Sequence, residues 1–125
     1  MINKAKEYKT GLFFRGAKNY YKCDALVNSL IQFLDSKGNI DKFVIDAEYV
    51  SCMSASRSSI LDFDRVKIDV ESGDIDCIVV KNITWVARNI FKVHEALNYF
   101  LENNVRFISI EDNYDNLEEL RKVAE

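Results

Sequence analysis

The 125-residue sequence has no proline, a single histidine, three cysteines and four glycines. One histidine and scattered cysteines give no constellation of metal ligands, so the sequence predicts no bound metal and no cofactor. The phosphate-binding patterns G-x-G-x-x-G and G-x-x-x-x-G-K-[ST] are also missing, which excludes the common nucleotide-binding loops. Cys23, Cys52 and Cys77 show no C-x-x-C spacing, and we expect them to be reduced.

Long hydrophobic runs are missing too, because no segment approaches the roughly 18 to 20 apolar residues that span a bilayer. The N-terminal stretch MINKAKEYKT is too polar for a signal peptide. We therefore expect a cytoplasmic protein without a membrane partner. With 48% hydrophobic residues the chain can bury one core, so residues 1–125 are expected to form a single domain.

The net charge of −3 argues against strong nucleic-acid binding by this domain alone, because phosphate affinity comes mainly from lysine and arginine. The charge is uneven, since the residues before Asp24 are mostly basic and those from Glu111 onward are mostly acidic. The basic segment is either a positively charged mouth at the end of the first strand or a solvated tail.

Short apolar runs alternate with amphipathic segments along the chain. Strands are expected at residues 11–15, 43–45, 75–80 and 105–110, and helices near 26–34, 60–70, 87–101 and 117–123. Asp24 is a candidate N-cap and Gly38 a candidate C-cap of the first helix, and the serine-rich stretch 51–59 is expected to be a loop. The alternating order predicts an α/β fold with a mostly parallel four- to five-stranded sheet and helices on both faces.

The candidate site lies in the stretch from Asp74 to Leu101. An apolar strand is followed there by a polar junction, residues 81–85, and then by an amphipathic helix. Ligands of α/β proteins usually bind at the carboxyl ends of strands, so this junction is the first place to expect function.

Four segments carry recognisable motifs. Phe13 to Ala17 is similar to Y-x-R-[VL]-S, and Asp46 to Tyr49 is similar to the start of D-x-x-Y-S-G. Gly73 to Asn89 follows G-x-I-D-x-V-[IV]-V-K-D-L-S-R-x-G-R-[ND] without a gap, and Val105 to Asp112 follows V-x-[FL]-x-S-[IL] with an acidic turn. The chain thus resembles the N-terminal catalytic domain of the serine site-specific recombinases, the resolvase/invertase family, especially its large-recombinase branch. The resemblance covers most of residues 11–114 and implies a resolvase-like fold.

In that family a serine hydroxyl attacks a DNA phosphodiester while several arginines neutralise the transferring phosphoryl group. By the resemblance, Ala17 occupies the place of the nucleophile and Trp85 the place of the junction arginine. Asn82 and Thr84 also depart from the pattern, so these four positions form a degenerate site. Arg15 and Arg88 match family arginines, and Arg57 is the candidate loop arginine; these three are the candidate phosphate contacts. Trp85 itself is expected to pack in the core or to make a protein contact.

The resemblance implies a recombinase domain that is catalytically inactive and acts through oligomerisation or through contacts with DNA or an active recombinase. The apolar helix from Val93 to Leu101 and the exposed end of the domain are candidates for an oligomer face. We expect residues 1–125 to include no C-terminal DNA-binding region, and we therefore expect DNA binding to be weak or to use a region outside this chain.

Two alternatives remain. The first is an active recombinase with a differently placed nucleophile, for example one of the serines between 51 and 59. The second is a phosphate-receiving regulatory domain, which needs acidic residues where Phe14-Arg15 and Lys81-Asn82 stand.

Overall fold

The computed structural model of the protein describes residues 6–15, 23–51, 56–86 and 89–124. Its elements in chain order are β1 (Glu7–Arg15), α1 (Cys23–Ser36), β2 (Lys42–Ser51), α2 (Ser56–Glu71), β3 (Cys77–Val80), the 3-10 helix η2 (Ile83–Trp85), α3 (Ile90–Glu102), β4 (Arg106–Ser109), β5 (Tyr114–Asp115) and α4 (Leu117–Ala124).

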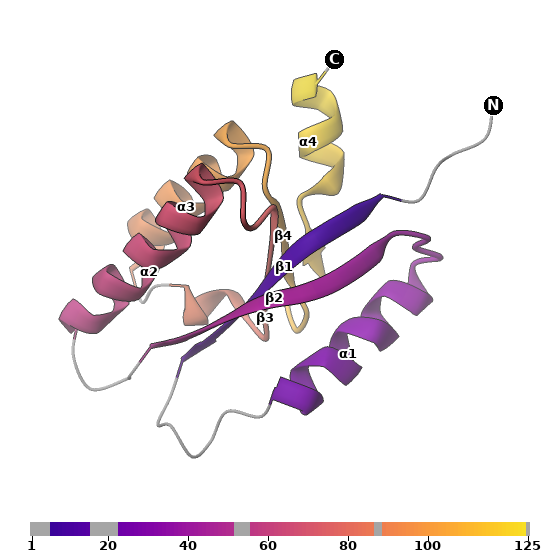
Figure 1. Cartoon of the computed structure of the whole chain (residues 1–125), viewed down its shortest axis with the longest axis horizontal. Coiled ribbons are helices and arrows are strands. Elements are labelled where there is room, and N and C mark those ends of the chain that lie inside the picture. Colours follow the sequence, from indigo (N-terminus) through magenta and orange to yellow (C-terminus); the bar gives the residue numbers. More distant parts are fainter. Residues whose placement is uncertain (1–5, 16–22, 52–55, 87–88, 125) are drawn as a thin grey trace.

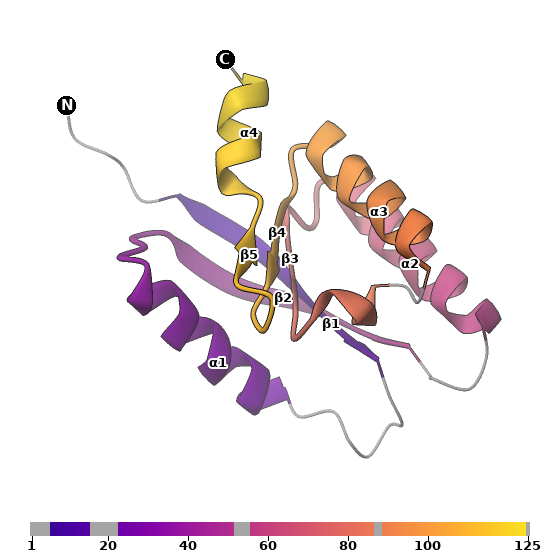
Figure 2. The same cartoon turned by 180° about the vertical axis from the view of Figure 1, so that it is seen from behind.

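The strands form one five-stranded sheet in the order β2-β1-β3-β4-β5. The first four strands are parallel, and β5 is antiparallel to β4. Helix α1 covers one face, while α2 and α3 lie side by side on the other (Figures 1 and 2). The predicted α/β class, with a mostly parallel sheet and helices on both faces, is therefore confirmed. None of the helices in the described segments is long and apolar enough to cross a membrane.

Two hydrophobic cores result, one on each face of the sheet. Side chains from α1 pack against Cys77 and Val79 of β3, whereas side chains from α2 and α3 pack against Ile78 and Val80 of the same strand. All four residues of β3 are buried because both faces of this strand are covered. This explains why the strand is a continuous apolar run in the sequence. Burial also raises the pKa of the Cys77 thiol well above its usual range.

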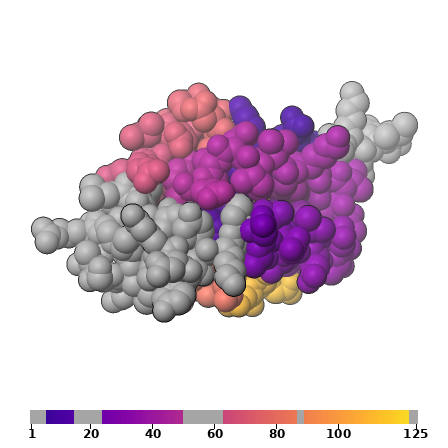
Figure 3. Space-filling view, turned by 60° about the horizontal axis from the view of Figure 1, so that its bottom comes forward, coloured from indigo at the N-terminus to yellow at the C-terminus, as the bar shows by residue number. Residues whose placement is uncertain are grey.

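The edge strand β2 changes face at a bulge. Its register with β1 shifts between Thr10 and Gly11, so that one residue of β2, Asp46, is left without a partner. Before the bulge, Phe43 and Ile45 pack on the α1 side; after it, Ala47 and Tyr49 pack on the opposite side. Figure 3 shows β2 running along the surface between α1 and α2.

Gly11, opposite the bulge, allows the ring of Tyr49 to lie over the backbone of β1. A Cβ atom at Gly11 would come within 2.6 Å of Cε2 of Tyr49. The phenol of Tyr49 donates a hydrogen bond of 2.5 Å to Asp69 of α2, which ties the edge strand to the helix above it. Tyr49 of the sequence motif thus links β2 to β1 and α2.

Several element boundaries differ from those expected. Helix α1 begins at Cys23, so Asp24 lies in the first turn and is not its N-cap. Helix α2 begins at Ser56 within the expected loop, and α3 begins at Ile90, three residues later than expected. Strand β1 begins at Glu7, four residues early, and the two-residue strand β5 was not foreseen.

The expected glycine cap of α1 is confirmed. Gly38 has φ +65°, and the amide of Asn39 donates to the carbonyl of Leu34 in a Schellman-type ending. Gly73, with φ +82°, ends α2 in the same way.

The apolar stripe of α3 is part of the monomer core. Val93, Ala96 and Phe100 are buried, so they are not available as the oligomer face that the sequence suggested. The exposed apolar residues of this helix are instead Ile90 and Phe91 in its first turn, with exposed fractions of 60% and 75%.

A buried arginine closes the amino edge of the sheet. Arg106 in β4 has a side chain that is only 2% exposed, and its guanidinium contacts Asp115 at 2.6 Å and Asp41 at 3.0 Å. It also lies over the rings of Tyr8 and Phe43, 5.2 and 5.1 Å from their centroids. The guanidinium thereby connects β4 with β5, with β1 and with the start of β2.

Replacing Arg106 with Met should destabilise the protein by about 3–5 kcal/mol, because Asp41 and Asp115 would lose their buried partner. The change Arg121→Met on the exposed face of α4 is the control and should alter stability by less than about 0.5 kcal/mol. Urea unfolding of both variants measures the difference. Equal stabilities of the two variants would contradict the role of Arg106.

High pH should weaken the fold through tyrosines whose pKa is raised, among them Tyr99 and Tyr114. Burial and a hydrogen bond to Glu71 raise the pKa of Tyr99 to about 12, and burial and a hydrogen bond to Glu119 do the same for Tyr114. Unfolded tyrosines ionise near pH 10, so this stabilisation is complete below about pH 10 and is lost as the pH rises toward 12. Urea midpoints should fall across this range, and less steeply in Tyr114→Phe. A fall of the same steepness in that variant would show that Tyr114 does not contribute.

Candidate functional site

The carboxyl ends of β1, β3 and β4 meet at one edge of the sheet because these strands are parallel. The junction from Lys81 to Trp85 follows β3 at this edge and ends in the short helix η2. The turn between β4 and β5 lies beside it. Its amides at Ile110 and Glu111 donate to the carbonyls of Val80 and Lys81 at 3.1 and 2.8 Å, so the ladder continues beyond the strands.

Asp112 of this turn holds the start of η2. Its Oδ2 atom accepts hydrogen bonds from the amide of Ile83 at 2.7 Å and from the hydroxyl of Ser109 at 2.6 Å. Asn82, the N-cap residue of η2, makes no side-chain cap bond, so the first amide of the helix is satisfied by a residue 29 positions away. Ser109 is completely buried. The junction and the acidic turn are therefore one unit.

The other polar side chains of the junction bond to each other or to the turn. The hydroxyl of Thr84 donates to the amide oxygen of Asn82, whose amide nitrogen donates to Oε1 of Glu111 at 3.2 Å. Nζ of Lys81 lies 3.7 Å from Oε2 of the same glutamate. Each of these groups has a partner within the unit.

Trp85 is the apolar end of the junction. It is half-buried and packs against the clusters on both faces of the sheet. Its ring centroid lies 6.0 Å from that of Phe14, with the planes tilted by 44°. The indole therefore packs against Phe14, the residue that precedes Arg15 in β1. Of the two expectations for Trp85, core packing and a protein contact, the structure agrees with core packing.

The structure brings together three of the seven residues singled out from the sequence: Asn82, Thr84 and Trp85. The backbone of Arg15 pairs with Ser51 at the end of β1, and that of Arg57 lies in α2, but both side chains are outside the described part. Ala17 and Arg88 lie outside the described residues altogether.

Sequence reasoning missed the roles of Glu111 and Asp112. Both were noted only as members of an acidic segment, although the motif that ends at Asp112 includes an acidic turn. Their position after β4, parallel and adjacent to β3, was the signal that could have placed them beside the junction. Within the basic segment, the ammonium group of Lys9 binds the carbonyl of Gly73 at the opposite edge, so this lysine does not contribute to a positively charged mouth at the end of β1.

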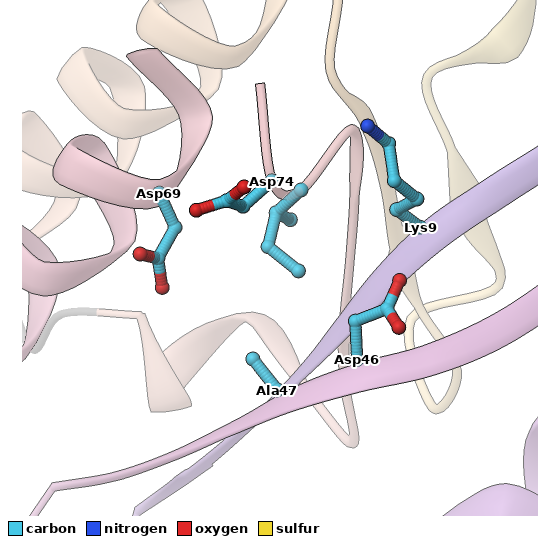
Figure 4. A pocket seen from close by; sticks show the side chains of 6 residues that line it. Lys9, Asp46, Ala47, Asp69 and Asp74 are labelled. Carbon is cyan, nitrogen blue, oxygen red and sulfur yellow. The ribbon is translucent and has the colours of Figure 1, made fainter. Parts of the chain in front are cut away.

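An open hollow of about 410 Å³ lies on the α2 side of the sheet, away from the junction (Figure 4). Three carboxylates and one lysine line it with Ala47 and Ile75, namely Asp46, Asp69, Asp74 and Lys9. Asp69 accepts from Tyr49 and Asp74 from Ser72 at 2.9 Å. In the described segments no group of three His, Cys, Asp or Glu residues could hold a metal ion. The excess of carboxylates makes the hollow a poor anion site.

The family model described as "Resolvase, N terminal domain" matches residues 23–124. The chain belongs to this family. It is a resolvase-family recombinase N-terminal domain, so the resemblance found in the sequence is confirmed, and the regulatory-domain alternative loses its support. The match begins at Cys23, so β1 and Ala17 lie outside the matched residues.

Two solved structures share the resolvase-type fold. The N-terminal catalytic domain of TP901-1 integrase has a TM-score of 0.62 and 15% identity, with 93% of this chain and 94% of that chain covered. A resolvase family site-specific recombinase from Streptococcus pneumoniae has a TM-score of 0.61 and 20% identity, covering 93% and 85%. The comparison with curated proteins finds no match.

Trp85→Ala should destabilise the domain by about 2 kcal/mol, because a half-buried indole that joins two cores is removed. Thr84→Ala, one residue away on the exposed side of η2, is the matched control and should cost less than about 1 kcal/mol. Urea unfolding of both variants is followed by circular dichroism. Tryptophan fluorescence is unsuitable because Trp85 is the only tryptophan and Trp85→Ala removes it. A loss for Trp85→Ala no larger than that of the control would exclude a packing role.

Proposed function

We propose that this resolvase-family domain no longer breaks DNA and acts through contacts with DNA and with other recombinase subunits. The observation that carries the proposal is the packing of Trp85. By the family motif, this position should hold an arginine that reaches the phosphate, and here an indole lies against Phe14 between the two cores.

The second support comes from the sequence. By the same motif Ala17 stands where the nucleophilic serine should be, and a methyl group cannot attack phosphorus. Losing a nucleophile costs on the order of 10⁶ in rate, and losing one charge-stabilising arginine costs roughly 10³ or more. Either loss alone would leave little activity.

The described hydroxyls at the carboxyl edge offer no obvious replacement. Ser109 is fully buried and donates to Asp112, and Thr84 is engaged with Asn82. Attack on phosphorus also needs in-line placement and an activating base. The alternative of an active enzyme therefore rests on the serines between 51 and 59, whose side chains lie outside the described part.

Contacts with DNA would use Arg15, Arg57 and Arg88, because planar guanidinium groups suit bidentate phosphate binding. The net charge of −3 favours weak binding, so stronger binding would come from a separate DNA-binding region. Residues 1–125 would then serve as a single oligomerising domain in the cytoplasm. It would pair with itself or with an active recombinase, through surfaces other than the buried stripe of α3.

A covalent-adduct assay tests the loss of chemistry. Two proteins are tested: the domain alone, and the domain fused to the DNA-binding region of a recombinase. Each is incubated with supercoiled DNA that carries candidate recombination sites. We expect no protein–DNA adduct and no relaxation. An adduct mapped to any serine or threonine would overturn the proposal in favour of the active alternative.

Restoring activity should require Ala17→Ser together with Trp85→Arg, because nucleophile and transition-state charge stabilisation are separate requirements. The same assay compares the two single variants with the double variant. Trp85→Arg alone should stay inactive. Full cleavage by Ala17→Ser alone would show that the loss of the junction arginine is unimportant.

A further inference from the structure

A lysine and a glutamate form an exposed ion pair at the carboxyl edge. Lys81 is the first residue after the central strand β3, and its ammonium group lies 3.7 Å from Oε2 of Glu111. Their side chains are 54% and 52% exposed. The pair is therefore in contact with solvent at the edge where ligands of parallel sheets approach.

Glu111 is held in this position by more than the lysine. Its amide donates to the carbonyl of Lys81 at 2.8 Å, and its Oε1 atom accepts from the side-chain amide of Asn82 at 3.2 Å. One carboxylate oxygen is thus fixed by Asn82 while the other faces Lys81. The arrangement follows from the β3–β4 ladder and is not a chance meeting of two long side chains.

The two acidic residues of the turn differ in what they hold. Asp112 satisfies a backbone amide and a buried hydroxyl, so its removal would disturb the junction. Glu111 balances one surface cation, and exposed ion pairs of this kind contribute little to stability. Its carboxylate can therefore be displaced or removed without loss of the fold.

We propose that Glu111 screens Lys81 from anions and thereby lowers the affinity of the carboxyl edge for the DNA backbone. This inference rests on the proposed contact with DNA and adds that Glu111 limits the affinity of that contact. A phosphate that approaches Lys81 meets the negative charge of Glu111 beside it, so it must either displace this carboxylate or bind against its repulsion. Glu111 would then keep isolated domains from binding DNA nonspecifically.

Glu111→Gln tests the screening, because glutamine still accepts the hydrogen bond from Asn82 but carries no charge. Binding of a fluorescein-labelled duplex of random sequence is followed by anisotropy from about 50 to 200 mM salt. We expect a several-fold gain in affinity over the wild type. The slope of log affinity against log salt should steepen by about 0.9, the value for one added phosphate contact.

A matched control exists on α3, where Lys92 and Glu95 form another exposed pair at 4.0 Å. Glu95→Gln changes the net charge by the same amount but should leave the slope unchanged. The double variant Glu111→Gln with Lys81→Met should return to the wild-type slope. The emission of Trp85 and urea midpoints close to those of the wild type would show that the junction is intact.

The outcomes separate this inference from the proposed function. Wild-type DNA binding that Glu111→Gln leaves unchanged, or raises no more than Glu95→Gln does, overturns the screening and leaves the DNA contact standing. A gain that survives loss of Lys81 also overturns it. No binding by any variant at the lowest salt overturns both the DNA contact and the screening.

Discussion

A buried guanidinium is the constraint on which the rest of the sheet depends. Arg106 begins β4 as the register partner of Cys77 in β3, and its guanidinium lies over the rings of Tyr8 and Phe43. Its charge is balanced by Asp115 of β5 and by Asp41 before β2. Because a buried cation must keep these partners, Arg106 ties β4 to β1, β2 and β5 at the amino edge.

The carboxyl edge is built on a different principle. Its described polar side chains form hydrogen bonds across the junction and the acidic turn. The indole of Trp85, at the end of η2, packs against Phe14 of β1. At the described positions of this edge, Trp85 packs against the core and Lys81 faces a carboxylate. The described part of the carboxyl edge is thus packed, and its polar side chains are paired with one another.

Much of the fold could be predicted because its signals are local. The apolar run of β3, the stripe of α3 and the glycine after α1 each depend on residues near in sequence. The errors arose where distant contacts decide. The bulge at Asp46 turns β2 over, and β5 exists only because it lies beside β4. Of the candidate site, the junction and Trp85 were predicted, and the partners supplied by Glu111 and Asp112 were not.

The sequence by itself determined the fold class and the family motifs, and it supplied the predictions for Ala17 and Trp85, since these depend on residue identity and order. Only the tertiary structure decided what surrounds them. It set Trp85 against Phe14, paired Lys81 with Glu111 and buried Arg106 between two carboxylates. The physical reason is that parallel strands bring together residues that lie tens of positions apart, and the charge, burial and hydrogen bonding of each are set by those neighbours.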